Sequence, residues 1–188
     1  MRRKVYTKEQ ILHSALDLVE KNGFTKFTAR SIAKHMNIST QPIYLEFKNM
    51  EELREAVFES IFDNLFKNTL KKVVTGDPVI DLALNFMRFA KKNPRLFRAL
   101  YIEESGVGHK LYERSFEGFR ELAKSVEKYK EIDEVHIDAL HTRIWMTATG
   151  LAVLTSSDIL SRNQEQIVQM VEDVIQMTLE NPAPIHVE

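Results

Sequence analysis

The 188-residue sequence contains no cysteine, a single tryptophan, five prolines and six glycines. Without cysteine, disulfide bonds and metal sites built on thiolates are excluded. No uncharged run approaches the length that a membrane-spanning helix requires, and the first residues pass directly into polar helix-start residues without a signal-peptide pattern. We therefore expect a cytoplasmic protein that does not associate with a membrane.

Charge is distributed unevenly along a chain whose net charge is only −1. Residues 1–48 carry nine Lys and Arg against four Asp and Glu, whereas residues 49–188 carry seventeen against twenty-three. A basic start on an acidic remainder suits a protein that presents one face to phosphates and keeps the rest away from them.

Helical periodicity runs through nearly the whole chain, and no convincing alternating strand pattern is present. The first helix is predicted to open at Thr7, where Gln10 completes a capping box, and to end at Asn22-Gly23. Turn residues then divide the rest of the chain into helices near residues 28–36, 39–47, 49–74, 77–92, 96–101, 109–129, 133–157 and 163–180. We predict an all-α fold of about nine helices.

Two segments are predicted to lie outside this helical pattern. Residues 104–108, Glu-Ser-Gly-Val-Gly, form the expected flexible loop, and the tail from Asn181 is too rich in proline to continue the last helix.

The segment from Thr28 to Leu53 is the most informative part of the sequence. Thr28 is a typical N-cap for a helix that points apolar residues inward, and Asn37 tolerates the left-handed backbone that ends such a helix. The inward residues of this helix are Ile32, Ala33 and Met36, with Ile38 following in the turn.

A second short helix follows this turn at once. We expect Ser39 to cap it and Pro42 to lie in its first turn, where a missing N–H costs no internal hydrogen bond. Ile43 and Phe47 would pack inward. Two helices joined by a tight turn are typical of a helix-turn-helix, whose second helix can enter the major groove of duplex DNA.

The same region resembles the amino-terminal head of the TetR-family transcriptional regulators. The residues that carry this resemblance are Gly23-Phe24, Thr28-x-x-x-Ile32-Ala33, Ile38-Ser39, Tyr44-x-x-Phe47 and Glu52-Leu53. The resemblance implies a three-helix DNA-binding head that a long fourth helix joins to a helical ligand-binding and dimerisation body. On this basis we divide the chain into a helix-turn-helix domain, residues 1–48, and a ligand-binding and dimerisation domain, residues 49–188.

Two positions depart from the family pattern. Asn37 replaces a usual glycine, a change that the turn tolerates, and Met50 replaces a lysine that would contact phosphate. Lys48 can supply the missing charge.

Gln41 is the sharpest candidate for reading a base, because its amide can form paired hydrogen bonds with adenine. Thr40 and Leu45 could touch a thymine methyl group, and Tyr44 matches a family tyrosine that commonly contacts phosphate. The expected backbone anchors are Thr28, Arg30, Ser39 and Lys48, together with an arm at Arg2, Arg3 and Lys4. Thr28 and Ser39 would serve as caps with or without DNA, and the arm could equally be a solvated terminus.

Aromatic residues are frequent in the body and could line a largely apolar ligand pocket, as the resemblance favours; the alternative is an ordinary packed core. The predicted pocket residues are Phe62, Phe66, Phe86, Phe89, Phe97, Tyr101, Phe116, Phe119 and Trp145. Tyr112 belongs to the same aromatic set, and Asn85, Arg88, His141 and Thr149 are polar residues that could orient a ligand. The closing helices are the expected subunit interface.

These features predict a ligand-responsive regulator, a repressor because repression is the usual mode of the family. It would bind a palindromic operator as a homodimer and be released by a small, largely apolar effector. No cofactor and no metal are expected.

Two other classes of protein fit the sequence less well. A metal-dependent helical enzyme could use Asp138 and His141, which share one helical face, but a di-iron bundle would also need Glu-x-x-His pairs, and the sequence has none. Gly-rich phosphate loops and Gly-x-Ser-x-Gly nucleophile motifs are missing too. An architectural DNA binder would leave two-thirds of the chain without an evident task.

Overall fold

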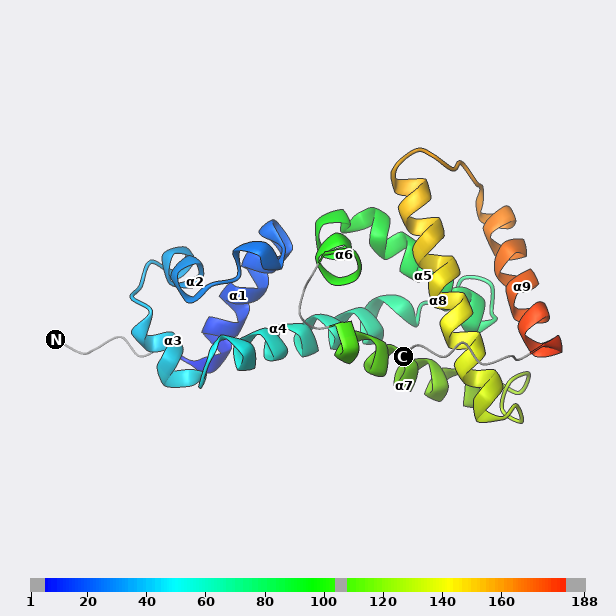
Figure 1. Cartoon of the computed structure of the whole chain (residues 1–188), viewed down its shortest axis with the longest axis horizontal. Coiled ribbons are helices and arrows are strands. Elements are labelled where there is room, and N and C mark those ends of the chain that lie inside the picture. Colours follow the sequence, from blue (N-terminus) through cyan, green and yellow to red (C-terminus); the bar gives the residue numbers. More distant parts are fainter. Residues whose placement is uncertain (1–5, 104–107, 182–188) are drawn as a thin grey trace. The chain divides into compact units, whose positions relative to one another are not determined.

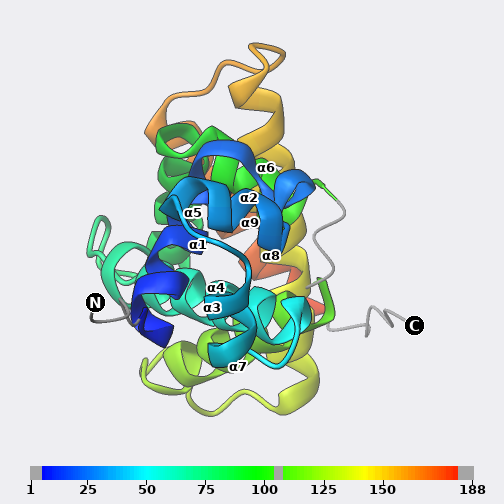
Figure 2. The same ribbon diagram turned by 90° about the vertical axis from the view of Figure 1, so that its left-hand side faces the viewer.

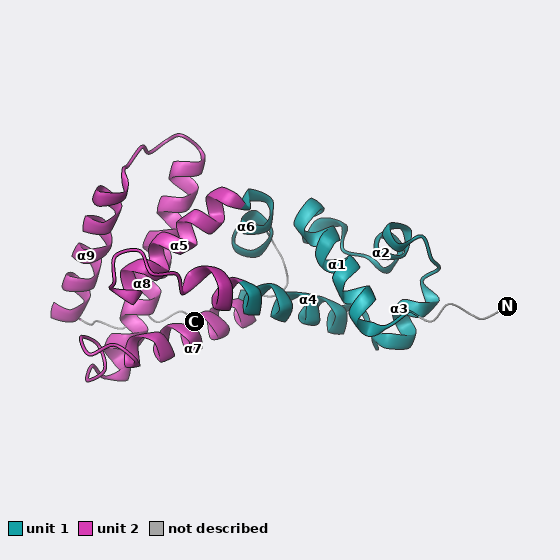
Figure 3. Ribbon diagram, turned by 180° about the vertical axis from the view of Figure 1, so that it is seen from behind, with its two compact units in different colours: residues 1–64, 93–108 teal, residues 65–92, 109–188 magenta. Residues whose placement is uncertain are grey.

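The computed structural model describes residues 6–103 and 108–181, and over these residues the chain forms nine α-helices and no strand (Figure 1). The predicted all-α fold is confirmed. The chain divides into two compact units, residues 1–64 with 93–108 and residues 65–92 with 109–188 (Figure 3). None of the described helices combines the length and apolar character that a bilayer span requires.

Helix α1 (Lys8–Asn22) begins with the predicted capping box. Thr7 Oγ1 accepts a hydrogen bond from the Gln10 amide at 3.3 Å, and Gln10 Oε1 accepts one from the Thr7 amide at 3.2 Å. Gly23 ends the helix with φ of +68°, a backbone conformation that side chains with a Cβ rarely adopt. The buried face of α1 consists of Ile11, Ala15, Leu18 and Val19.

A short 3₁₀ turn, η1 (Phe24–Lys26), leads into α2 (Ala29–Met36), and α3 (Gln41–Glu46) follows a tight turn (Figure 2). Within unit 1, α1 packs against α2, α3 and α6 (Pro94–Tyr101). Thr28 Oγ1 accepts the Ser31 amide at 3.1 Å, as expected of an N-cap. Asn37 adopts the predicted left-handed conformation, with φ of 56° and ψ of 48°.

The predicted cap of the second helix is wrong. Ser39 lies one residue before the N-cap, a place that Thr40 takes with helical backbone angles and no side-chain cap hydrogen bond. A capping hydroxyl needs an extended backbone to reach back over the first-turn amides, and Thr40 does not have one. The first turn instead closes through the Thr40 carbonyl, which accepts the Ile43 amide at 3.1 Å.

Helix α4 (Met50–Leu65) begins with reciprocal hydrogen bonds. Asn49 Oδ1 accepts the Glu52 amide at 2.8 Å, and Glu52 Oε2 accepts the Lys48 amide at 2.8 Å. The α-helical geometry ends much earlier than the predicted Val74. A π-helical turn, η2 (Phe66–Leu70), follows Leu65, and residues 71–77 are not helical.

Helix α5 (Pro78–Lys92) explains why the helical backbone does not continue beyond Leu70, because its side chains bind the backbone of the residues that follow. Asn85 Nδ2 donates to the Leu70 carbonyl at 3.2 Å and to the Lys72 carbonyl at 2.6 Å. The Asp81 carboxylate accepts the amides of Val74 and Thr75 at 3.0 and 2.6 Å. These polar groups are paired without a helix, so the loop is as well satisfied as helical backbone would be.

Unit 2 is completed by three further helices, α7 (Gly108–Lys124), α8 (Glu134–Ser156) and α9 (Gln164–Glu180). Within it, α5 packs against α8 and α9, and α8 packs against α9. Asp133 caps α8 by accepting the His136 amide at 2.9 Å, and Asn163 begins α9 with a capping box.

Helix α7 ends at Lys124 rather than near the predicted Tyr129. Lys124 Nζ donates to the Ile132 carbonyl at 2.7 Å across the turns that follow. Tyr129 is completely buried, and its hydroxyl donates to Asp77 Oδ2 at 2.7 Å. The aromatic residue that appeared to extend the helix instead anchors the connection to α8.

Three predicted features fall outside the described residues: the basic arm at Arg2 to Lys4, the loop at residues 104–107 and the tail from residue 182. Gly108, the last residue of the predicted loop, is the first residue of α7.

Candidate functional site

Helix α3 has a buried face and an exposed face that differ sharply. Ile43 and Phe47 are buried, at 0% and 1% exposure, and anchor the helix in unit 1. Tyr44 and Leu45 are 52% and 74% exposed, and Gln41 is also exposed. The side chains of Gln41, Tyr44 and Leu45 are therefore accessible to a partner molecule.

The predicted backbone anchors lie before and after α3 in the sequence, and their side chains are accessible. Thr28, Arg30, Ser39 and Lys48 are exposed, whereas Thr40 is half-buried. Thr28 already serves as the N-cap of α2, so its hydroxyl lies at the positive end of that helix, where a phosphate oxygen would be favoured. Lys48 follows α3 directly, and its amide is held by Glu52.

The other candidate site lies in unit 2, where the aromatic rings of α7 and α8 surround His141. The centroids of the Tyr112, Phe116, Phe119 and Trp145 rings lie 5.2 to 5.5 Å from that of the imidazole. His141 is only 3% exposed, and its burial lowers its pKa to about 4. A neutral imidazole in an aromatic shell is a polar group placed in otherwise apolar surroundings, the composition typical of small-molecule sites.

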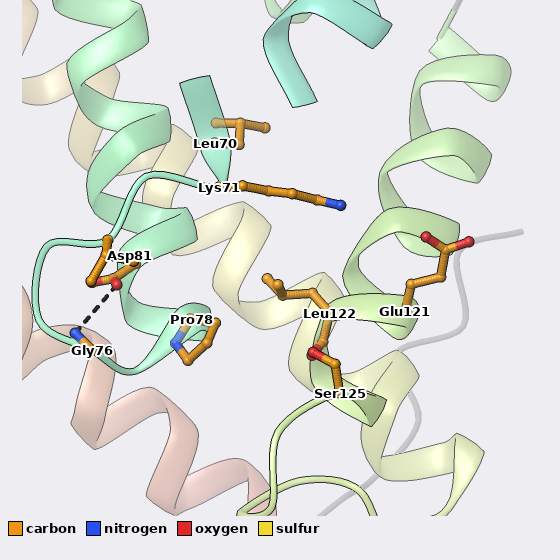
Figure 4. A pocket seen from close by; sticks show the side chains of 9 residues that line it. Leu70, Lys71, Gly76, Pro78, Asp81, Glu121, Leu122 and Ser125 are labelled. Atoms are coloured by element: carbon orange, nitrogen blue, oxygen red, sulfur yellow. Dashed lines mark hydrogen bonds between the residues drawn. The ribbon is translucent and has the colours of Figure 1, made fainter. Parts of the chain in front are cut away.

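A pocket of about 480 Å³ lies elsewhere in unit 2, between the end of η2, the start of α5 and the end of α7 (Figure 4). The Lys71 side chain extends toward the α7 side, where Glu121, Leu122 and Ser125 lie. The full lining comprises Leu70, Lys71, Val73, Gly76, Pro78, Asp81, Glu121, Leu122 and Ser125.

Asp81 forms part of the pocket wall, but the loop already uses its carboxylate. It accepts three backbone amides, those of Val74, Thr75 and Gly76, and the Thr75 hydroxyl at 2.7 Å. Burial acts to raise the pKa of Asp81, but these hydrogen bonds outweigh it and hold the pKa below its usual value. The residue therefore stiffens the wall of the pocket.

Comparison with known proteins decides between the classes of protein that the sequence left open. Residues 11–57, which span most of α1, all of α2 and α3, and the first half of α4, match the family described as "Bacterial regulatory proteins, tetR family". Over residues 11–57, the chain belongs to the TetR family of transcriptional regulators. No curated protein matches the chain in sequence.

Solved structures of TetR-family proteins share the fold along nearly the whole chain. A transcriptional regulator of the family from Vibrio parahaemolyticus is similar with a TM-score of 0.62 and 16% identity, over 90% of this chain and 96% of that one. The fatty acid degradation regulator FadR from Bacillus halodurans is similar with a TM-score of 0.59 and 15% identity, over 95% and 97%. A TetR protein from Acinetobacter baumannii AYE in complex with minocycline gives a TM-score of 0.57 and 12% identity, over 95% and 99%.

Membership in the TetR family also settles the question of an enzyme, since the family consists of regulators and not enzymes. Asp138 and His141, the pair considered for metal binding, have other partners in this TetR-family chain. Tyr112 Oη lies 3.3 Å from Asp138 Oδ1, and His141 Nε2 lies 2.8 Å from Ser115 Oγ. Among the residues that the structure describes, no cluster of His, Asp and Glu could hold a metal ion.

The nine predicted pocket residues are not gathered in one place, and the pocket of about 480 Å³ is lined by none of them. Three belong to unit 1, namely Phe62, Phe97 and Tyr101, and the Phe97 and Tyr101 rings stack at 5.4 Å. Six belong to unit 2, namely Phe66, Phe86, Phe89, Phe116, Phe119 and Trp145. The last three of these meet around His141.

The polar candidates also have different surroundings. Asn85 is occupied in holding the loop after η2, and Arg88 donates to Gln164 Oε1 at 2.9 Å. His141 and Thr149, both on α8, each keep a buried polar atom without a hydrogen-bond partner among the described residues, Nδ1 and Oγ1 respectively.

Ser115 was missed by sequence reasoning, because a serine within an amphipathic helix gives no signal of its own. Its spacing from Tyr112 and Phe119 places all three on one face of α7, and only the pairing of α7 with α8 reveals His141 as the partner.

Proposed function

We propose that this TetR-family chain is a ligand-responsive repressor. It binds a palindromic operator as a homodimer and leaves the operator when a small, largely apolar effector binds the body. The observation that carries the DNA-binding part is the face of α3, where exposed Gln41, Tyr44 and Leu45 stand over buried Ile43 and Phe47.

In this proposal the side chains of α3 have different roles in DNA recognition. Gln41 reads a base through paired hydrogen bonds, and Thr40 and Leu45 touch thymine methyl groups. Tyr44 contacts the sugar-phosphate backbone, as do the anchors Thr28, Arg30, Ser39 and Lys48, which fix the register of the protein without reading sequence. Lys48 replaces the charge that Met50 does not provide. Residues 1–48 form the reading domain, and residues 49–188 serve ligand binding and dimerisation.

Helices α8 and α9 supply the subunit interface in this proposal. Met146 and Leu154 on α8 are 55% and 38% exposed, and Met177 on α9 is 67% exposed. Gly150 lies between Met146 and Leu154 on the same face, since these residues are four apart, and a Cβ there would meet open space. A two-fold dimer would place two recognition helices about 34–36 Å apart, or a larger spacing by whole turns, on a palindromic site.

The effector is proposed to bind in unit 2, at the aromatic cluster around His141. Its surroundings are apolar except for a few placed polar atoms, as expected of a site for a small apolar molecule. The similar structure from Acinetobacter baumannii AYE is a complex with minocycline, and the Bacillus halodurans protein is named for fatty acid degradation. Both names support a small organic effector for a chain of this fold.

Selection of bound fragments from genomic DNA tests the proposal. We expect the selected fragments to share one palindromic sequence, and candidate apolar compounds to release the protein from it at fixed salt. Fragments without two-fold symmetry would contradict the dimeric site, and unchanged operator affinity with every bound compound would contradict effector control.

A further inference from the structure

The buried histidine of the aromatic cluster is held in one orientation by Ser115. Its Nε2 lies 2.8 Å from Ser115 Oγ, and this hydroxyl donates to the Tyr112 carbonyl at 3.0 Å. A serine hydroxyl has a single hydrogen, so Ser115 must accept from His141 rather than donate to it. The proton of the neutral imidazole therefore lies on Nε2, and Nδ1 presents a lone pair.

This lone pair has no partner. His141 Nδ1 is buried and accepts no hydrogen bond from any described residue. The Tyr112 hydroxyl, the polar group of the neighbouring ring, is directed to Asp138 Oδ1 at 3.3 Å and Thr142 Oγ1 at 3.1 Å. A buried acceptor left unpaired is costly, and such groups in native proteins require an explanation.

A second unpaired polar atom lies along the same face of α8. Thr149 Oγ1 is buried without a partner, whereas Thr147 and Thr155 on the same helix donate to the carbonyls of Arg143 and Leu151. His141 and Thr149 are two turns apart, and Trp145 lies between them in sequence and on the same face. Two unsatisfied polar atoms thus flank an aromatic ring on one side of α8.

We propose that the effector is an apolar ring compound carrying a hydrogen-bond donor, a hydroxyl or N–H group, which it gives to Nδ1 of His141 within the rings of Tyr112, Phe116, Phe119 and Trp145. This inference rests on the proposed function, because it specifies the effector of that site. Tyr112, Phe116 and Trp145 are half-buried rather than buried, so the ligand reaches the imidazole from their side. A hydrocarbon without a polar group would leave Nδ1 unpaired. An anionic group would place its own lone pair against the lone pair of Nδ1, which is unfavourable.

Phenol and toluene test this requirement, since they have nearly the same shape and differ in the donor. Trp145 is the only tryptophan of the chain and its ring lies 5.5 Å from that of His141, so its fluorescence reports binding to the full-length protein. We expect phenol to bind at least about tenfold more tightly than toluene, the effect of one satisfied acceptor. Toluene is the more hydrophobic of the two, so burial alone would give the opposite order. Equal affinities, or tighter binding of toluene, would overturn the proposal.

The variant His141→Gln places an amide near Nε2, able to reach Ser115, and has no acceptor at the position of Nδ1. We expect its preference for phenol to disappear, while His13→Gln, at an exposed histidine of α1, keeps it. If His141→Gln does not fold, nitrogen NMR of the wild-type imidazole decides. Phenol should shift the resonance of the unprotonated Nδ1, and a resonance that stays in place in the phenol-saturated protein would overturn the proposal.

Operator binding separates this inference from the proposed function. A preference for phenol that depends on His141, without any release of operator DNA, would support the donor site and contradict effector control. Release of DNA by toluene and phenol alike would support effector control and contradict the donor site.

Discussion

Lys8 Nζ on α1 lies 3.0 Å from Glu52 Oε1 on α4, while the other oxygen of the same carboxylate accepts the Lys48 amide at 2.8 Å. Lys8 also lies over the Phe47 ring, with its Nζ 4.8 Å from the centroid. The backbone hydrogen bond from Lys48, followed by the contact with Lys8, lowers the pKa of Glu52. One carboxylate thus links the Lys8 side chain of α1 to the Lys48 backbone that follows α3.

We expect Glu52→Ala to weaken binding to all operator sequences alike, because Lys48 loses its fixed position. Removal of a negative charge alone would strengthen binding to the phosphates of DNA. The expected loss of affinity is therefore opposite to the simple electrostatic effect. Glu51→Ala removes the same charge one residue earlier and should bind as well as wild type or better. Band-shift titrations at fixed salt measure both variants, and equal behaviour would contradict the positioning role of Glu52.

Gln41→Ala should reduce discrimination at one base position by about 1–3 kcal/mol, because the paired hydrogen bonds to one base are lost. Arg30→Ala should weaken binding to all sequences similarly and reduce the salt dependence, as loss of a phosphate contact does. Affinities for duplexes carrying single base-pair changes separate the two. A uniform loss for Gln41→Ala would remove it as the base-reading residue.

Protonation of His141 should destabilise the folded chain in acid. Burial lowers its folded pKa to about 4 from 6.5, so the unfolded chain binds more protons between these values. The free energy of unfolding should then fall as pH decreases from 6.5 to 4, by at most about 1.4 kcal/mol per pH unit from this group. Denaturant titrations at several pH values measure this effect. The free energy of unfolding of His141→Gln should depend less on pH than that of the wild type, and equal pH dependences of the two proteins would contradict the prediction.

Gly150→Leu should convert the proposed dimer to monomers without loss of helix. A side chain at this position meets open space within one chain, but would stand between Met146 and Leu154 on the proposed interface. Gly108→Leu makes the same change at another open position, on α7, and should leave the dimer intact. Sedimentation analysis measures the assembly; a Gly150→Leu dimer as tight as wild type would place the interface elsewhere.

Gly118→Ala should destabilise unit 2, because a Cβ at this position would overlap the Phe66 ring of η2. Overpacking of this kind costs about 1–3 kcal/mol. A smaller side chain in the double variant Phe66→Leu with Gly118→Ala should restore part of the loss. Thermal unfolding of the variants measures this, and additive losses would contradict the clash.

Sequence periodicity and caps were sufficient to predict most of the fold. The capping box at Thr7, the cap at Thr28 and the left-handed Asn37 are local features, decided by residues within one turn of each other, and all three are present. The exposed and buried faces of α3 also follow from local spacing.

Features that depend on distant residues could not be predicted in this way. The end of the helical backbone at Leu70 is set by Asp81 and Asn85 on α5, which bind the backbone of residues 70–76. The pairing of Ser115 with His141 likewise requires the packing of α7 against α8. Composition could identify the aromatic residues of the body, but not which of them would contact one another in the folded chain.

The shortness of α3 has a consequence for engineering. A six-residue segment is too short to stay helical by itself, so an excised peptide would be unstructured, and Ile43 and Phe47 must remain anchored in unit 1. By contrast, the outward side chains of α3 are exposed and do not contribute to the buried core; they are those of Gln41, Tyr44 and Leu45. In the proposed function, exchanging Gln41 and Leu45 would therefore change the preferred DNA sequence, while the buried residues that hold α3 in place remain unchanged.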